Sequence, residues 1–167
     1  RFRDLPVARA FSVAVGLGVL WAALYVTDIA SLSLKDKIFW SSLRFASVPF
    51  IPLALLSVAL NHAGLGGLMR RSRLLFFCIP VITSLLSLAG SPLIRSDFFM
   101  DLSKPLPVLG FAKGPWYSLH IGYSYALVIL AFGILVRSLR DAKPLYRNKT
   151  VIIIAGFTCV FVLDILF

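Results

Sequence analysis

The 167-residue sequence has no glutamate and little charge of any kind. Charged residues make up 14% of the chain, whereas a soluble domain contains about 25%. Only two cysteines, Cys78 and Cys159, and two histidines, His62 and His120, are present. These scarcities argue against a soluble domain, a disulfide framework and a metal site built from several histidines or cysteines. We therefore predict neither a metal centre nor a cofactor.

The charge that is present is mostly of one sign, because seventeen Lys and Arg outnumber seven aspartates and give a net charge of +10. A nucleic-acid-binding protein can be equally basic. However, 59% of this chain is hydrophobic, with a mean hydropathy of +0.92. The basic residues fall between long apolar runs. This pattern indicates a protein of the lipid bilayer with cationic loops, and no nucleic-acid partner.

Five apolar runs are each near the roughly 20 residues that a helix needs to cross about 30 Å of hydrocarbon. They cover residues 7–30, 38–60, 74–89, 115–136 and 151–167. The third run is the shortest, so its ends are the least defined. Hydrocarbon tolerates only helices and closed barrels, and the runs lack period-2 alternation. We therefore predict an all-α, polytopic transmembrane bundle, without strands, as one domain over residues 1–167.

Basic residues are concentrated before the first run and in the second and fourth connections. They are Arg1, Arg3, Arg9, Arg70, Arg71, Arg73, Arg137, Arg140, Lys143, Arg147 and Lys149. The positive-inside rule then places residue 1 on the cytoplasmic side and residue 167 on the outer side. Residue 167 ends an apolar run without a polar tail, and residue 1 is not methionine. We expect a fragment truncated at both ends, with one further helix before it and one after it.

Four ionisable residues are predicted to share one layer in the outer part of the membrane. They are Asp28, Arg44, His120 and Asp164. Arg44 and His120 each follow a boundary lysine by seven residues, which places them roughly 10 Å below the outer interface. Ionisable groups at such depth face the bundle interior or pair with one another. We therefore predict that these residues bind a ligand or sense a signal.

Helical spacing adds three aromatic residues to these candidates. Trp116, His120 and Tyr123 are spaced i, i+4, i+7 and share one helix face, and Trp40 stands four residues before Arg44. One interpretation is a pocket open to the outside, in which Arg44 and His120 bind an anionic or polar ligand. The other is charge neutralisation of Arg44 by an aspartate, without any ligand. The spacing is compatible with both.

The second apolar run contains Pro49 and Pro52 close to its middle. A proline inside a helix removes a backbone hydrogen bond and clashes with the preceding turn. We predict a kink or an unwound turn there, which acts as a hinge rather than as a ligand contact.

Three segments carry recognisable motifs: KIFWSSLRFASVPFIPLALLSVALNHAG at 37–64, GPWYSLHIGYSY at 114–125 and VRSLRDAKPLYRNKTVIIIAG at 136–156. They resemble, in this order, the third helix, the fifth helix, and the cytoplasmic loop with the sixth helix of the seven-helix N-terminal region of bacterial sensor histidine kinases. The resemblance covers essentially the whole chain, as helices two to six of seven.

The resemblance implies a sensory input module of the bacterial inner membrane. It also implies a homodimer that detects an unknown small ligand and signals to a cytoplasmic effector domain in the same chain, either a histidine kinase or a diguanylate cyclase. The sequence has no Gly-rich nucleotide loop or acidic metal cluster, so we predict that this region is not itself an enzyme. A passive membrane anchor and a portion of a small-molecule transporter remain as alternatives.

Overall fold

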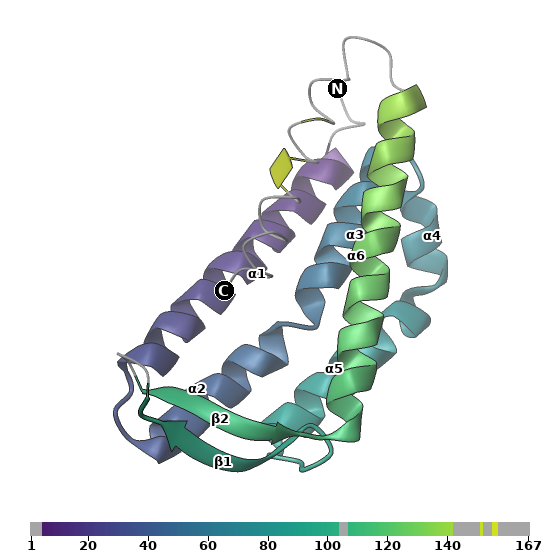
Figure 1. Ribbon diagram of the computed structural model, residues 1–167. Coiled ribbons are helices and arrows are strands. Elements are labelled where there is room, and N and C mark those ends of the chain that lie inside the picture. Colours follow the sequence, from purple (N-terminus) through teal and green to yellow (C-terminus); the bar gives the residue numbers. More distant parts are fainter. Residues whose placement is uncertain (1–4, 104–106, 142–150, 152–154, 157–167) are drawn as a thin grey trace.

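Long helical passes stand side by side, and a small β-hairpin lies at one end of them (Figure 1). The computed structural model describes residues 5–103, 107–141, 151, 155 and 156. Its helices are α1 (Leu5–Ala30), α2 (Leu34–Ser47), α3 (Phe50–His62), α4 (Gly66–Arg71), α5 (Arg73–Leu88) and α6 (Pro115–Asp141). The strands are β1 (Arg95–Asp101) and β2 (Val108–Lys113). We call the end that carries the strands the hairpin end, and the opposite end the basic end.

Three passes are long and apolar enough to cross a membrane: Pro6–Ala30, Leu34–His62 and Pro115–Arg140. They coincide with the first, second and fourth predicted runs, with ends shifted by a few residues. The third run corresponds to α5, whose 16 residues cover only about 24 Å. The short helix α4 leads directly into α5. The fifth run lies outside the described residues except for Val151, Ala155 and Gly156, which are helical.

The second pass is broken where the prolines predict a break. α2 ends at Ser47 and α3 begins at Phe50, with Val48 and Pro49 in a turn between them. Pro49 has no N–H to donate, so the regular helical ladder cannot continue through it. Nearby, the Ala46 carbonyl accepts a hydrogen bond of 2.6 Å from the Ser84 hydroxyl of α5. The predicted break is therefore present, and a neighbouring helix contacts it, whereas its action as a hinge stays a prediction.

The buried core lies between α3 and α6. Its members are Leu53, Leu56, Ala59, Leu60, Leu127, Ala131 and Leu135. Many other large apolar side chains of the helices point outward and are exposed. Such an outer surface fits a chain whose surroundings are acyl chains and not water.

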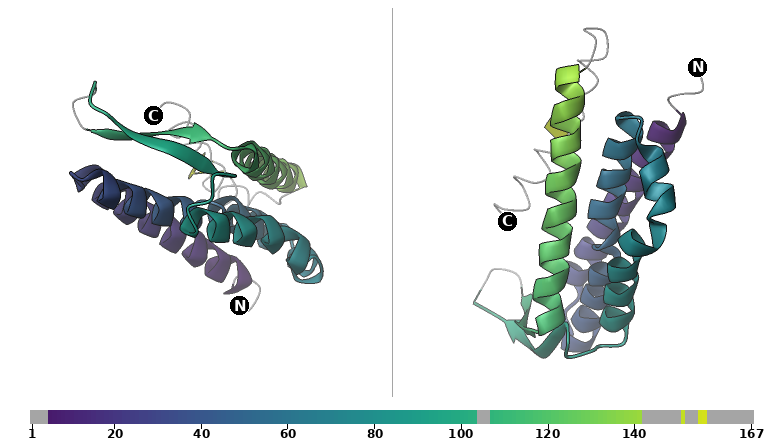
Figure 2. Two further views of the ribbon diagram at one scale, coloured as in Figure 1. Left: turned by 90° about the horizontal axis from the view of Figure 1, so that it is seen from below. Right: turned by 90° about the vertical axis from the view of Figure 1, so that its right-hand side faces the viewer.

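The prediction that the chain has no strands is wrong for the third connection. β1 and β2 pair antiparallel from Arg95 opposite Lys113 to Asp101 opposite Val108, with an irregularity between Ser96 and Phe99. The hairpin lies across the end of the bundle, near α2 and the start of α6 (Figure 2). Hydrocarbon restricts backbone structure only within the spans. This hairpin lies between spans, where a two-stranded ladder meets no such restriction.

The start of α6 is tied to the end of the α5 connection, which explains the Gly-Pro-Trp motif. The backbone N–H of Gly114 donates to the Ile94 carbonyl at 2.8 Å, and that of Trp116 donates to the Leu93 carbonyl at 2.9 Å. A Cβ at Gly114 would collide with the Leu93 carbonyl. Pro115 is the first residue of α6, a position where a missing N–H costs nothing. The hairpin is therefore fixed to the bundle where α6 begins.

Candidate functional site

Two of the predicted site residues form an ion pair between the first and second passes. Arg44 Nη2 lies 3.1 Å from Asp28 Oδ2. The guanidinium of Arg44 also lies over the Tyr25 ring, 4.8 Å from its centroid. Trp21 stacks on Tyr25 from one turn earlier, with ring centroids 5.4 Å apart. Asp28 is thus the aspartate that neutralises Arg44, and α1 and α2 are joined through a charge and an aromatic face.

Lys37 lies inside the protein, although the sequence placed it at the membrane boundary. Its side chain is only 1% exposed. Lys37 Nζ donates to the Asp28 carbonyl at 2.8 Å and to the Ile29 carbonyl at 3.4 Å. These carbonyls belong to the last turn of α1 and have no partner within the helix. The lysine therefore caps α1 and complements the negative end of its dipole.

Arg95 of β1 is the largest omission from the sequence-based site. It is 4% exposed, and it donates from Nη1 to Ser41 Oγ at 2.8 Å and from Nη2 to Ser42 Oγ at 3.1 Å. Its guanidinium also lies over three phenylalanine rings, with centroid distances of 4.8, 5.2 and 5.6 Å to Phe45, Phe111 and Phe98. One side chain of the hairpin is thus anchored to α2.

Burial lowers the pKa of Arg95 to about 10, and the positive charge of Arg44 acts in the same direction, whereas Asp28 raises it. The group therefore stays positively charged at neutral pH. Its hydroxyl partners and aromatic neighbours stabilise the charge by direct contact. The sequence held one signal that could have indicated this role, namely the phenylalanines close to Arg95 in the third connection.

His120 lies in the bundle interior and is fully buried, with 0% of its surface exposed. Its ring meets the Phe45 ring edge to face, with centroids 5.6 Å apart. The Phe45 ring, over which the Arg95 guanidinium lies, also stacks on the Tyr117 ring, with centroids 5.7 Å apart. Neither ring nitrogen of His120 has a hydrogen-bond partner among the described residues. His120 is therefore linked to the second pass through Phe45 and not through a hydrogen bond to Arg44.

The residues of the His120 face all turn inward, as their helical spacing predicted. Trp116 Nε1 donates to Thr83 Oγ1 at 2.9 Å, and the Tyr123 hydroxyl donates to the Phe76 carbonyl at 2.6 Å. In a regular helix, the Phe76 carbonyl would accept from the N–H of residue 80. That residue is Pro80, which has no N–H. The tyrosine therefore supplies the hydrogen bond that the proline removes, and it connects α6 with α5.

A family model described as the N-terminal 7TM region of histidine kinase matches residues 1–167. The chain belongs to this family. Comparisons with curated proteins and with solved structures find no match. This histidine kinase 7TM region is a sensory membrane module. The family thus agrees with the resemblance that the sequence motifs indicated.

A small hollow lies at the hairpin end of this 7TM region. The hollow beside Arg95 measures about 10 Å³ and is lined by Ser42, Leu86, Ser87, Gly90, Ser91, Ile94, Arg95 and Phe98. That volume is close to the minimum for a single water molecule. Within residues 5–103 and 107–141, His, Cys, Asp and Glu side chains form no group of three that could hold a metal ion. A ligand larger than water does not fit this hollow unless its lining residues move.

Two other predicted site residues, Trp40 and Asp164, have no described contact with Arg44 or His120. Trp40 is half-buried and meets the Phe39 ring at 5.2 Å, edge to face. Asp164 lies outside the described residues, so its place in the outer layer stays a prediction.

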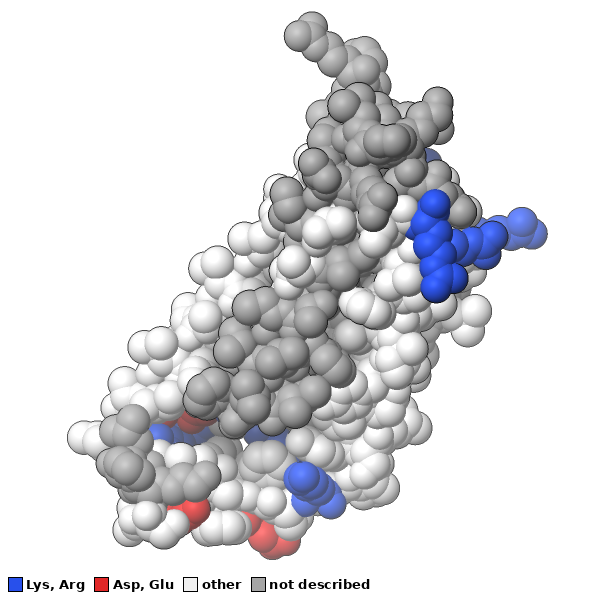
Figure 3. All heavy atoms as spheres, turned by 45° about the horizontal axis from the view of Figure 1, so that its top comes forward, with Lys and Arg blue, Asp and Glu red and all other residues white. Residues whose placement is uncertain are grey.

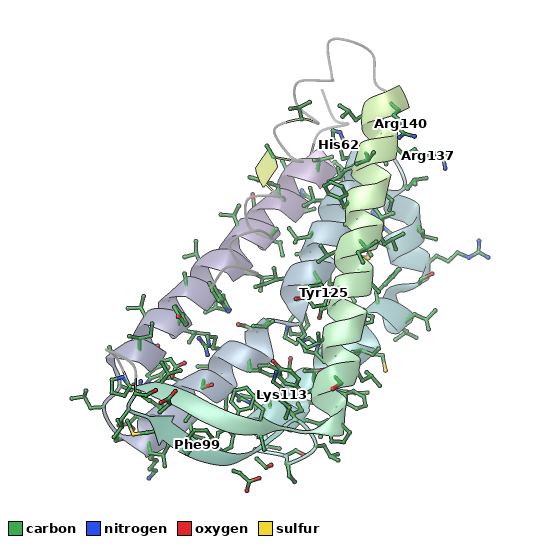
Figure 4. All side chains as sticks on the ribbon, in the orientation of Figure 1. His62, Phe99, Lys113, Tyr125, Arg137 and Arg140 are labelled. Atoms are coloured by element: carbon green, nitrogen blue, oxygen red, sulfur yellow. The ribbon has the colours of Figure 1, made fainter. Side chains whose placement is uncertain are left out.

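Lys113 at the end of β2 lies with its Nζ 5.3 Å from the Tyr117 ring centroid, and Figure 4 shows it near the start of α6. A second basic residue thus connects the hairpin with the helices.

Proposed function

We propose that this 7TM region detects a signal at its hairpin end and relays it by helix repacking to a cytoplasmic histidine kinase in the same chain. The observation that carries the proposal is Arg95. A side chain of the hairpin, which lies outside the spans, is buried against Ser41 and Ser42 of α2. Any displacement of the hairpin must therefore break these contacts or move α2 with it.

Movement of α2 has a route into the rest of the bundle. Phe45 contacts Arg95 on one side and His120 of α6 on the other. The break at Val48 and Pro49 lets α2 change its angle without forcing α3 to follow. A stimulus that prefers one arrangement of these elements shifts the population toward it. The hinge converts a displacement at the hairpin into a change in how α6 packs.

The proposed sensing residues are those of the outer layer and its aromatic neighbours. They are Asp28, Trp40, Arg44, Trp116, His120, Tyr123 and Asp164. Arg44 and His120 recognise an anionic or polar small ligand, with the aspartates as counter-ions. Asp164 couples the layer to the helix that follows. The module works as a homodimer in the bacterial inner membrane, with residue 1 in the cytoplasm and residue 167 outside.

The test is autophosphorylation of the full-length kinase in membranes, with the variants Arg44→Ala and His120→Ala. We expect both to change the ratio of stimulated to basal output. Lys35→Ala is the matched control, because Lys35 is an exposed basic residue on the same helix as Arg44, and we expect it to behave as wild type. Wild-type output from both Arg44→Ala and His120→Ala would contradict the sensing role and leave the ion pair as charge neutralisation.

A passive membrane anchor is the alternative that a specific observation favours. Arg44 already has Asp28 as its partner, and Trp116 and Tyr123 already donate to groups of α5. An anchor needs no more than such satisfied contacts. If kinase output is insensitive to every substitution at the hairpin end, including Arg95→Gln, the anchor is the better description.

A further inference from the structure

Helices α4 and α5 follow each other directly and form one pass. Two arginines lie within this pass and not at its first residue. Gly66 begins the pass, and Arg70 and Arg71 follow about 6 Å further along the axis. Ser72 separates the two helices. Its N–H donates to the Leu68 carbonyl at 3.0 Å, and its carbonyl accepts from Phe76 N at 3.2 Å. The backbone therefore continues through a local distortion in which both arginines lie.

An open hollow accompanies this distortion. Its volume is about 570 Å³, and Arg70, Arg71, Ser72, Leu74 and Leu75 line it. Leu74 is 87% exposed and Leu75 is 77% exposed. Little of the described part of the chain covers these two leucines, so acyl chains can contact them. Cationic and lipid-facing groups thus meet in one depression.

Within the described part of the chain, no acidic side chain forms an ion pair with Arg70 or Arg71. On the face that Figure 3 shows, a group of basic side chains lies at this end without acidic ones, whereas basic and acidic side chains lie together at the other end. A guanidinium pairs readily with a phosphate oxygen through its planar set of donors. Two guanidiniums above two exposed leucines match the order of groups in a phospholipid, with the phosphate above the hydrocarbon.

We propose that the hollow at the α4–α5 distortion binds an anionic phospholipid. Its phosphate lies on Arg70 and Arg71, and one acyl chain lies along Leu74 and Leu75. A zwitterionic lipid fits less well, because its ammonium group would stand close to two guanidiniums. This site lies at the basic end, far from the proposed sensing residues, and does not depend on their role.

The test is binding of phosphatidylglycerol and phosphatidylcholine to the purified full-length protein, measured by native mass spectrometry. We expect the wild type to prefer phosphatidylglycerol. The variant Arg70→Gln/Arg71→Gln should lower its binding constant about 30-fold, from the loss of two cations near the headgroups. Arg9→Gln/Arg140→Gln is the matched control, because it removes two charges that do not line the hollow. It should retain the preference.

An equal loss in both double variants would overturn the proposal, because general surface charge would then explain the binding. Absence of any preference for phosphatidylglycerol in the wild type would overturn it as well. A second measurement avoids dependence on folded variants. Wild-type protein in vesicles that contain phosphatidylglycerol with a photoreactive acyl chain should give adducts at Leu74 or Leu75. Adducts spread evenly over the lipid-facing helices would contradict the site.

Discussion

The two ends of the bundle carry their charges in opposite ways. At the hairpin end, Asp28, Lys37 and Arg95 are buried, and each has a partner on another element. At the basic end, Arg9 and Arg140 are exposed. Figure 4 shows Arg140 at the far end of α6, away from Lys113 and Phe99 of the hairpin. These three charges of the hairpin end are enclosed by protein, whereas Arg9 and Arg140 are left to the surroundings.

This difference indicates what each set of charges does. Enclosed charges must be satisfied by particular atoms, so they fix how helices and hairpin fit together. Exposed charges near the headgroups determine the direction of insertion, and for that role many positions serve equally well. Substitutions should therefore be costly at the hairpin end and cheap at the basic end.

The largest expected effect is that of Arg95→Met. The variant loses two charged hydrogen bonds and three aromatic contacts while keeping much of the apolar volume. We expect a loss of about 3 kcal/mol in the free energy of unfolding. Arg140→Met is the matched control at the other end, and thermal unfolding in detergent micelles measures both. Similar midpoints for the two variants would remove the contrast between the ends.

Breaking the ion pair should have the next largest effect. Asp28→Asn leaves the Arg44 guanidinium without its counter-ion, and we expect a loss of about 2 kcal/mol. Arg44→Met alone should cost a similar amount. The double variant should cost less than the sum, because neither charge is then left unpaired. Strictly additive losses, measured in the same unfolding assay, would show that the pair contributes no coupling.

Much of this fold could be predicted because it depends on local patterns. The long apolar passes follow from run length, and the break near Pro49 follows from the missing N–H. The position of Trp116, His120 and Tyr123 on one face of α6 follows from helical spacing. The pairing of Arg44 with an aspartate follows from the cost of an isolated charge in lipid. These predictions can be made without knowing which helices are neighbours.

The rest depends on contacts between distant segments, which spacing does not reveal. Neither Lys37 nor Arg95 is among the site residues that the sequence predicts. Their burial results from the meeting of α1, α2 and the hairpin, with Arg95 hydrogen-bonded across more than fifty positions to Ser41. The hairpin itself was missed because the rule against strands in hydrocarbon was applied to a segment outside the spans. The hydrogen bond from Tyr123 to Phe76 likewise requires knowing that α5 lies beside α6.

A smaller effect is expected between the two ends, at Tyr123. Tyr123→Phe removes the hydrogen bond to the Phe76 carbonyl, which Pro80 cannot supply, and should cost about 1 kcal/mol. In a Pro80→Ala background, the new N–H can serve that carbonyl, so Tyr123→Phe should then be nearly neutral. Unfolding midpoints of the four proteins in this cycle give the coupling. An equal loss in both backgrounds would show that the tyrosine does not replace the proline's missing donor.

The smallest effect is expected at Arg9, on the exposed basic end. Arg9→Gln removes a charge that water and headgroups solvate, and we expect a change below about 0.5 kcal/mol in the same assay. Lys37→Gln is the informative counterpart, because it also removes one positive charge but leaves two carbonyls of the last turn of α1 without their cap. If Arg9→Gln destabilised the protein as much as Lys37→Gln, charge at the basic end would be held by specific contacts as well. Enclosure would then no longer distinguish the two ends.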